Sequence, residues 1–500
     1  MSPLTSRRRS SSFASRTGLI AGFLLFIGLA AIMAAFFFGQ ERMAITGAIT
    51  FVLLALALVD IRLTILGVFA FLVVLGDLRR LLIPVAGWSG TDPLLLIAPG
   101  ISVILLGHLL ATQRLNLRSL LSRWMLLFTG VMFLQIFNPV QGGLAVGIAG
   151  AIFLIVPTFW FWIGQAYGTP ALARTLFYYL LVPLSIPAVA MGFIQLFNGY
   201  LPYQKEWYRI AGYAAIGTDI NSLRPISLFV NITEYLIFLS IVVVLLTAAL
   251  MHKKAARSFK LTALVLIPVC TASILLAGSR GPVVMSITVI ALLWALRGKT
   301  IRAWVPRLAL ALLLGGGGLV WGLTHAGNVE SQNEQIADNL ARQADLVETG
   351  GTTGIHLELA WQGIRYGIEN PLGGGIGSIT RAATKFGGTK LSSEVDITNM
   401  FMATGVGGGI IYLVLIIIAA TSAIRYWHRE RSLIAYGIVG VLAVTGMAWL
   451  SAGNYLITPL VWLVIGILDR LQSETSSDAS SNAPSEAEVE SAPQSVSAAA

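Results

Sequence analysis

Residues 261–296 read LTALVLIPVCTASILLAGSRGPVVMSITVIALLWAL, two apolar runs joined only by the turn Gly278-Ser279-Arg280-Gly281. Each run is long enough to cross most of a bilayer, so the stretch predicts a helical membrane hairpin. Glycine and serine alone suffice for such a turn, whereas an arginine at helix depth costs a few kcal/mol. The Arg280 guanidinium therefore needs a partner. Because it keeps its charge and carries five donors, we expect an anion such as a phosphate.

The composition of the whole chain is that of a membrane protein. Of the 500 residues, 56% are hydrophobic and 11% are charged, and the mean hydropathy is +0.80. A soluble protein of this size would carry about a quarter charged residues. We count about 14 apolar segments that could span the hydrocarbon core, of which those at Leu63 and Tyr455 are short. The segments begin near Gly18, Met43, Leu63, Pro93, Trp124, Gly142, Leu176, Ile226, Leu261, Pro282, Leu308, Met400, Leu433 and Tyr455.

The basic residues alternate between the two sides of these segments. With the N-terminus in the cytoplasm, every second loop is rich in Lys and Arg, with clusters that begin at Arg7, Arg114, Lys253, Arg297 and Arg425. The short outside turns hold only Arg42, Arg79, Arg80 and Arg280. This asymmetry is the positive-inside pattern. The net charge of +10 thus reflects topology and contact with anionic membrane lipids, and we expect no nucleic-acid partner.

We therefore expect an all-α fold, a polytopic membrane helix bundle of about 14 transmembrane helices. The bundle is expected to carry one large extracytoplasmic helical loop. The lone cysteine, Cys270, lies in an apolar segment and excludes a disulfide framework and a thiolate metal site. The predicted parts are a basic cytoplasmic N-terminus (1–16), a first bundle of about 11 helices (17–324), the large loop (325–399), about three C-terminal helices (400–470) and a disordered acidic cytoplasmic tail (471–500).

An outside loop at residues 198–225 is rich in tyrosine and ends at Arg224. Most of its aromatic residues fit an interfacial belt, and the alternative is a platform on which sugar rings stack. Arg224 stands directly before Pro225 and the apolar run 226–250, which places a guanidinium at the outer rim, on the side of Arg280. Further along that run, Asn231 and Glu234 are polar residues in an apolar setting. Either interhelical hydrogen bonding or a role in a site explains them.

The large loop, residues 325–399, contains a helical pattern and a glycine cluster. Leu357, Trp361, Ile364 and Ile368 recur at helical spacing, and we expect this apolar face to lie against the bundle. The helix is predicted to stop before the glycines at 373–377. Their backbone N–H groups could hold a phosphate, but the Lys-Ser/Thr ending of a P-loop is missing. A helix stop followed by a turn is the better interpretation of the glycines alone.

Four stretches resemble the bacterial O-antigen ligase and O-antigen polymerase superfamily of integral-membrane glycosyltransferases. They are RPISLFVN (224–231), GSRG (278–281), NPLGGGIG (370–377) and TNMFMATGVGG (398–408). The first resembles an arginine-led start of a helix, the second a Ser-Arg-Gly turn, the third a Pro-Leu-Gly stretch of the large loop, and the fourth the exit from that loop. The order of the four motifs is more specific than any one of them, and the resemblance covers roughly residues 200–450. It implies a GT-C-like bundle.

The resemblance implies an inverting, metal-independent transfer of glycan from a polyprenyl-diphosphate-linked donor. Arg224 and Arg280, with Ser279, match the positions expected to hold the donor diphosphate and to stabilise the charge of the leaving group. A base would deprotonate a hydroxyl of the glycan or lipid acceptor. The resemblance also implies a multi-pass protein of the bacterial cytoplasmic (inner) membrane, with an active site that faces outside. No cofactor is implied, and other polysaccharide assembly proteins are expected partners.

The chain departs from the family pattern at the expected base. The family has a His-Asn pair at the loop exit, whereas this chain has Thr398 followed by Asn399, and a threonine hydroxyl is no base near neutral pH. Asp396 is the first candidate by proximity, with Glu394 adjacent, and His356 is the second by its intrinsic pKa. The expected additional substrate contacts are Arg342, Arg365 and Asn399.

Two functions of different class compete on this sequence. A surface-polysaccharide polymerase or ligase would use the outer arginines for chemistry. A transporter or flippase of lipid-linked oligosaccharide would use them only to bind the head group. A transport path should present polar groups on both sides, whereas the candidates here gather outside, which favours the enzyme. A purely structural scaffold would leave Arg280 unexplained. The sequence leaves open both the sugar and whether the acceptor is another lipid-linked glycan, a lipid core or a protein.

Overall fold

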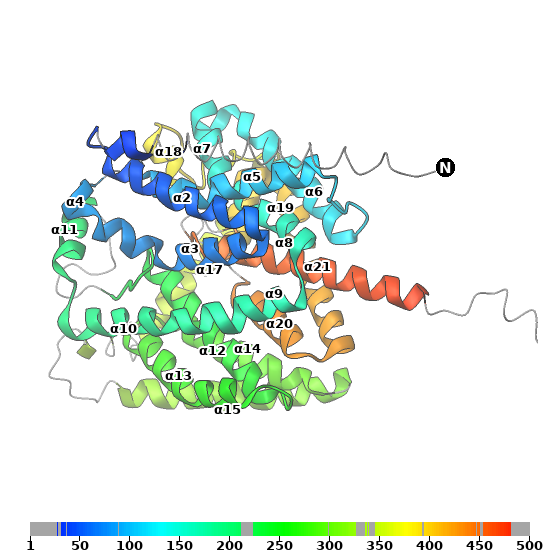
Figure 1. Cartoon of the computed structure of the whole chain (residues 1–500). Coiled ribbons are helices and arrows are strands. Elements are labelled where there is room, and N and C mark those ends of the chain that lie inside the picture. Colours follow the sequence, from blue (N-terminus) through cyan, green and yellow to red (C-terminus); the bar gives the residue numbers. More distant parts are fainter. Residues whose placement is uncertain are drawn as a thin grey trace, which may run out of the picture.

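The described regular elements are all helices (Figure 1). The computed structural model describes residues 28, 32–36, 38–88, 90–211, 224–298, 300–326, 336, 337, 339, 346–392, 395–446, 448–450 and 454–481. The helices are α2 (Glu41–Val59), α3 (Ile61–Leu81), α4 (Ile83–Ala86), α5 (Ile97–Ala111), α6 (Leu120–Leu134), α7 (Leu144–Leu154), α8 (Phe159–Tyr167), α9 (Pro170–Arg174), α10 (Val182–Asn198), α11 (Pro202–Ala211), α12 (Ile232–Met251), α13 (Arg257–Leu276), α14 (Arg280–Leu296), α15 (Ile301–Ala326), α17 (Leu346–Glu369), α18 (Arg381–Lys385), α19 (Asp396–Glu430), α20 (Leu433–Val444) and α21 (Ile457–Ser481).

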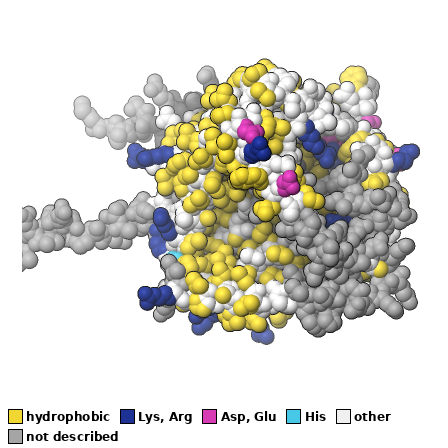
Figure 2. Space-filling view, turned by 180° about the vertical axis from the view of Figure 1, so that it is seen from behind, with side chains coloured by type: hydrophobic (Ala, Val, Ile, Leu, Met, Phe, Trp, Pro, Cys, Tyr) yellow, Lys and Arg dark blue, Asp and Glu magenta, His cyan; other side chains and the backbone are white. Residues whose placement is uncertain are grey.

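Nine helical stretches within the described ranges are long and apolar enough to cross a membrane. This confirms the prediction of an α-helical membrane protein. Figure 2 shows a broad area of hydrophobic side chains on one face of the molecule, with Lys and Arg at its left and lower edges and at a few places in its upper part. Such a surface is stable in lipid, since lipid tails are as apolar as the side chains that they contact.

The segment at Leu63, predicted to be short, is the 21-residue helix α3 and one of the nine. Its apolar sequence pattern stops early because Asp77, Arg79 and Arg80 occupy its last turns, where all three are buried. At the other end of the chain, α21 continues to Ser481, past the predicted tail boundary at 470. Arg470 and Glu474 form an i,i+4 ion pair of 2.7 Å across this extension. Of the first predicted segment, which begins at Gly18, only residues 28, 32–36 and 38–40 are described, and the tail beyond 481 lies outside the described residues.

The stretch that begins at Leu261 forms the predicted hairpin. Helix α13 ends at Leu276, Gly278 takes a left-handed φ of 73°, and α14 begins at Arg280. Both helices pack against α12, so α12 and α14 begin at the same end of the bundle. We call this end, which also bears α4 and α11, the α11 end, and the opposite end, where α12, α14 and α21 finish, the α21 end. The two ends lie at the left and right of Figure 1.

Helix α17 covers the predicted helix of the large loop and packs on α19. The expected orientation of its apolar face is wrong, because Leu357, Trp361 and Ile368 are 72%, 63% and 57% exposed. Gly367 lies on the packed face, where a Cβ would stand 2.7 Å from the carbonyl oxygen of Phe401. In a membrane protein the closest helix contacts use small residues, and an apolar stripe can be left to the lipid.

Candidate functional site

Residues 225–229 form a buried, non-helical segment that leads from Arg224 into α12. Irregular backbone at this depth must find hydrogen-bond partners within the protein. Gln195 of α10 provides two of them, because its side-chain oxygen accepts from the backbone N–H groups of Ile226 (2.9 Å) and Ser227 (2.7 Å). Ser227 itself has a left-handed φ of 52° and donates its hydroxyl to the carbonyl of Ala188. The first of the four motifs is thus fixed in one conformation.

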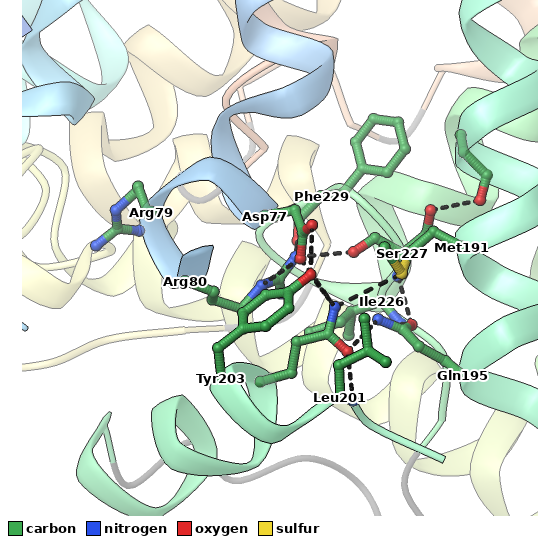
Figure 3. A network of polar contacts seen from close by, with 12 residues as sticks. Asp77, Arg79, Arg80, Met191, Gln195, Leu201, Tyr203, Ile226, Ser227 and Phe229 are labelled. Carbon is green, nitrogen blue, oxygen red and sulfur yellow. Dashed lines mark hydrogen bonds and ion pairs between the residues drawn. The ribbon is translucent and has the colours of Figure 1, made fainter. Parts of the chain in front are cut away.

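The carbonyl groups of the same segment are held by α3 (Figure 3). Arg80 donates from one guanidinium nitrogen to the carbonyl oxygens of Ser227 (2.8 Å) and Phe229 (2.9 Å). The backbone N–H of Asp77 donates to Leu228 at 2.9 Å. Arg80 is 1% exposed, and its Nε lies 3.4 Å from a carboxylate oxygen of Asp77. A buried guanidinium therefore sets the path of the chain that carries Arg224.

Helix α11 closes this network from the outer side. Tyr203 donates its hydroxyl to one oxygen of Asp77, and the Gln204 amide donates to the other, each at 2.9 Å. Burial, followed by the neighbouring Asp77 carboxylate, raises the pKa of Tyr203, which keeps its phenol protonated and able to donate. The Trp207 ring lies 5.2 Å from the Arg80 guanidinium carbon, a cation–π contact.

A second cluster at the α11 end contains Arg42 of α2 and Arg79 of α3, two of the arginines that the sequence predicted to lie outside. Asp92 accepts from Arg42 and, at 3.0 Å, from Arg79, and the side chains of all three residues are buried. Arg42 also donates to the carbonyl of Gly87 at 2.7 Å. Both guanidinium groups lie over the Trp88 ring. Ion pairs this deeply buried have a structural role, because removal of either partner would leave an unpaired charge in the interior.

The two arginines that match the diphosphate-binding positions lie in different surroundings from these three. Arg224 and Arg280 are each half-buried. The carbonyl of Arg224 accepts the Tyr200 hydroxyl at 2.8 Å. Arg280 is the first residue of α14, Ser279 is the N-cap, and the neighbouring Gly278 lies close to Asn339 of the large loop. The Ser240 hydroxyl of α12 lies 3.5 Å from the carbonyl of Pro282, so the start of α14 lies against α12.

The third and fourth motifs are in direct contact. The N–H groups of Gly374 and Gly375 donate to the carbonyls of Met402 (2.8 Å) and Ala403 (2.9 Å), and Gly377 donates to the Gln141 side chain at 2.9 Å. Helix α19 breaks at Gly405, where φ is 71° and a Cβ would stand 1.9 Å from the carbonyl oxygen of Pro371. The glycine amides are thus committed to the protein. The glycines allow the two chain segments to approach each other closely. This agrees with the interpretation that they form a helix stop followed by a turn.

Asp396, the first candidate base, is the first residue of α19 and is 4% exposed. Its carboxylate accepts the hydroxyl of Tyr412 and the backbone N–H groups of Trp449 and Leu450. Glu234 acts in the same way, since it accepts the N–H of Leu456. The two carboxylates therefore hold Trp449, Leu450 and Leu456, which lie between α20 and α21. Because Asp396 is buried, an acceptor hydroxyl could reach its carboxylate only if the surrounding chain moved.

The remaining predicted site residues are only partly brought together. Asn399 lies in the first turn of α19, and the Thr398 hydroxyl donates to the carbonyl of Val395 at 3.1 Å. Arg365 lies on an exposed part of α17, paired with Glu369 at 2.7 Å, which raises the pKa of Arg365. His356 belongs to α17, but its side chain lies outside the described residues, as do Arg342 and Glu394.

The sequence analysis missed the residues that position the site. Gln195 and Gln141 hold two of the four motifs through side-chain hydrogen bonds, and Asp77 supports the first motif through its backbone N–H and its ion pair with Arg80. The available signal was their polarity within apolar runs, since a buried polar group requires a partner. No protein-family model and no curated protein matches the chain.

Proposed function

We propose that this protein is a membrane glycosyltransferase that transfers or polymerises polyprenyl-diphosphate-linked glycan units in the synthesis of a surface polysaccharide. One observation carries the proposal. The two arginines at the diphosphate-binding positions of the resemblance, Arg224 and Arg280, precede or begin helices that start at the same end of the bundle. Three other arginines at this end, Arg42, Arg79 and Arg80, are committed to buried carboxylates.

The proposed chemistry assigns the two arginines to the leaving group. Cleavage of the bond between the sugar and the diphosphate leaves negative charge on the polyprenyl diphosphate, and two guanidinium groups would stabilise it without a metal. The Ser279 hydroxyl would donate a further hydrogen bond. An acceptor hydroxyl would attack the anomeric carbon from the opposite face, which inverts its configuration. Arg365, Arg342 and Asn399 would contact the glycan.

The proton of the acceptor hydroxyl would pass to Asp396 or to His356. Asp396 requires a change in the connection between α20 and α21, because its oxygens now accept hydrogen bonds from that connection. Transfer to His356 requires that α17, the helix that carries it and that packs on α19, place the imidazole ring beside the acceptor hydroxyl. These requirements differ, so substitution of each residue separates the two roles.

The proposed setting is the bacterial cytoplasmic (inner) membrane, with the α11 end outside. The distribution of Lys and Arg supports this orientation. We further propose the GT-C-like arrangement of about 14 spans. The short apolar helices α14 and α20, with α15 and α21, would supply spans beyond the nine.

The direct test is incubation of the purified protein with a polyprenyl-diphosphate-linked repeat unit, followed by separation of the lipid-linked products. A polymerase would lengthen the glycan on the lipid, and a ligase would move it intact to an added acceptor. Unchanged donor under both conditions would contradict the proposal.

Transport of a lipid-linked oligosaccharide is the second candidate, because the α21 end also holds a polar cavity, lined by Lys253 and Arg297. The part of α12 between the two ends favours transfer, since it is almost entirely buried and apolar from Phe238 to Ala249. Proteoliposomes separate the two functions. A flippase would move intact donor across the bilayer, and a transferase would change its glycan without moving it.

A further inference from the structure

A cavity of about 780 Å³ opens at the α21 end, far from the site described above. It lies between the connection from α12 to α13, the connection from α19 to α20, the end of α14 and helix α9. Ligand sites of proteins commonly measure about 300–1,000 Å³, so this space accommodates a small molecule or a head group.

The lining of the cavity is strongly basic. Its cationic residues are Arg174, Lys253, Lys254, Arg297 and Arg431, and its only acidic residue is Glu430. Glu430 pairs with Arg429, which is not part of the lining, at 3.3 Å. Within the described part of the chain, none of the five cations forms an ion pair with a carboxylate.

Aromatic rings surround the charged rim. Trp427 and Tyr436 lie 3.8 Å apart by ring centroid, and Phe259 stacks on Tyr178 at 5.0 Å. Trp427, Tyr436 and Phe259 line the cavity. Rings of this kind lie where the hydrocarbon of a bilayer meets its head groups. The cavity therefore combines exposed cations with aromatic walls, the side-chain types that suit a head group.

Two further features distinguish the cavity from an ordinary set of cytoplasmic loop charges. Its cations come from four separate connections or helix ends, which the fold brings around one space. The Nδ1 atom of His252 is buried at its wall and has no hydrogen-bond partner among the described residues. The positive-inside pattern accounts for exposed charges but not for their convergence on a cavity.

We propose that this basic cavity binds a phosphate-bearing anion, with the head group of an anionic phospholipid as its principal source. Basic pockets between transmembrane helices bind such head groups, and each Lys or Arg near the surface contributes to the attraction. The proposal does not depend on the proposed glycosyltransferase activity, because it concerns the opposite end of the bundle.

The test uses the full chain in nanodiscs of phosphatidylcholine and measures binding of added cardiolipin by native mass spectrometry. The double variant Lys253→Ala/Lys254→Ala and the single variant Arg297→Ala should each weaken binding, by on the order of tenfold for the double change. The matched control is Arg118→Ala/Arg123→Ala, which removes two exposed charges from the same end outside the cavity. This control should leave the binding of cardiolipin to the cavity unchanged. Thermal unfolding of each variant verifies that it is folded.

A second titration, with inorganic pyrophosphate, distinguishes a phospholipid head group from a free phosphate as the anion that the cavity binds. Competition between pyrophosphate and cardiolipin supports a site open to any phosphate anion. Binding of cardiolipin without competition supports a site that also requires the lipid chains. Equal affinity of the cavity variants and the wild-type protein, or an equal loss in the Arg118/Arg123 control, would overturn the proposal.

Discussion

Three arginines at the α11 end and two at the α21 end lie in opposite surroundings. At the α11 end, Arg42, Arg79 and Arg80 are at most 7% exposed and face Asp92 or Asp77. At the α21 end, Arg297 and Arg431 are exposed at the rim of a cavity, and neither is paired with a carboxylate within the described residues. A buried guanidinium is held by the protein because desolvation makes it costly, whereas an exposed one is left to solvent or ligand. Burial and partner, more than residue type, thus distinguish the arginines held within the protein from those exposed at the cavity.

Asp92→Ala should have the largest effect, because it removes the carboxylate that Arg42 and Arg79 share. Loss of one partner from a buried ion pair costs about 3–5 kcal/mol. We expect the free energy of unfolding in detergent to fall by about this amount, as measured by denaturant titration. Arg118→Ala, at an exposed position of the α21 end, should be neutral. If both variants unfolded alike, the contrast between the two ends would be lost.

Arg80→Met should have the next largest effect. It removes two charge-assisted hydrogen bonds to residues 227 and 229 and the ion pair with Asp77, but it keeps much of the side-chain volume, and Asp77 keeps its hydrogen bonds from Tyr203 and Gln204. The expected loss of stability is about 2–3 kcal/mol. Glycosyl transfer should fall more than stability alone explains, because the segment that carries Arg224 loses its anchor. A variant with full transfer activity would show that Arg80 does not position this segment.

Gly405→Ala should cost about 1–3 kcal/mol. Its φ of 71° and the nearby carbonyl of Pro371 leave no room for a Cβ. Gly407→Ala is the matched control two residues away, where no atom lies within 4 Å of an added Cβ. Because alanine favours a helix, the control should be neutral or more stable by up to about 1 kcal/mol. Equal thermal unfolding of the two variants would contradict the break in α19.

The smallest effect is expected at His252, beyond the end of α12. Burial lowers the pKa of His252, with Lys254 and Lys260 adding to the effect and the Arg431 backbone opposing it. The folded state thus binds this proton less readily than the unfolded state does. The resulting stability is complete above the unfolded pKa of about 6.5 and is lost as pH falls through the folded value. His252→Gln should flatten the fall in unfolding temperature below about pH 6.5; an unchanged slope would exclude His252 as its source.

The sequence predicted the helices well because long apolar segments report membrane spans directly. It predicted the hairpin at Gly278 to Arg280 from its turn residues. It could not show that Asp77 and Asp92 pair with Arg42, Arg79 and Arg80, because these partners meet only in the folded bundle. Arg42 and Asp92 lie 50 residues apart in the chain.

The same reason applies to the candidate base. Asp396 lies near the expected position in sequence, but its partners Trp449 and Leu450 come from a connection more than 50 residues later. The predicted orientation of the apolar face of α17 was wrong for a different reason. Periodicity identifies an apolar face, but in a membrane protein that face can contact lipid as well as protein.

The most direct test of the account is the transfer rate of Arg280→Ala with a polyprenyl-diphosphate-linked donor. Arg209→Ala serves as control, since Arg209 is an exposed α11 residue paired with Glu206. If Arg280 stabilises the leaving diphosphate, its loss should slow transfer by about 100-fold or more with unfolding temperature little changed. The control should retain the wild-type rate. A folded Arg280→Ala protein that transfers glycan at the wild-type rate would contradict the assignment of Arg280 to the donor diphosphate.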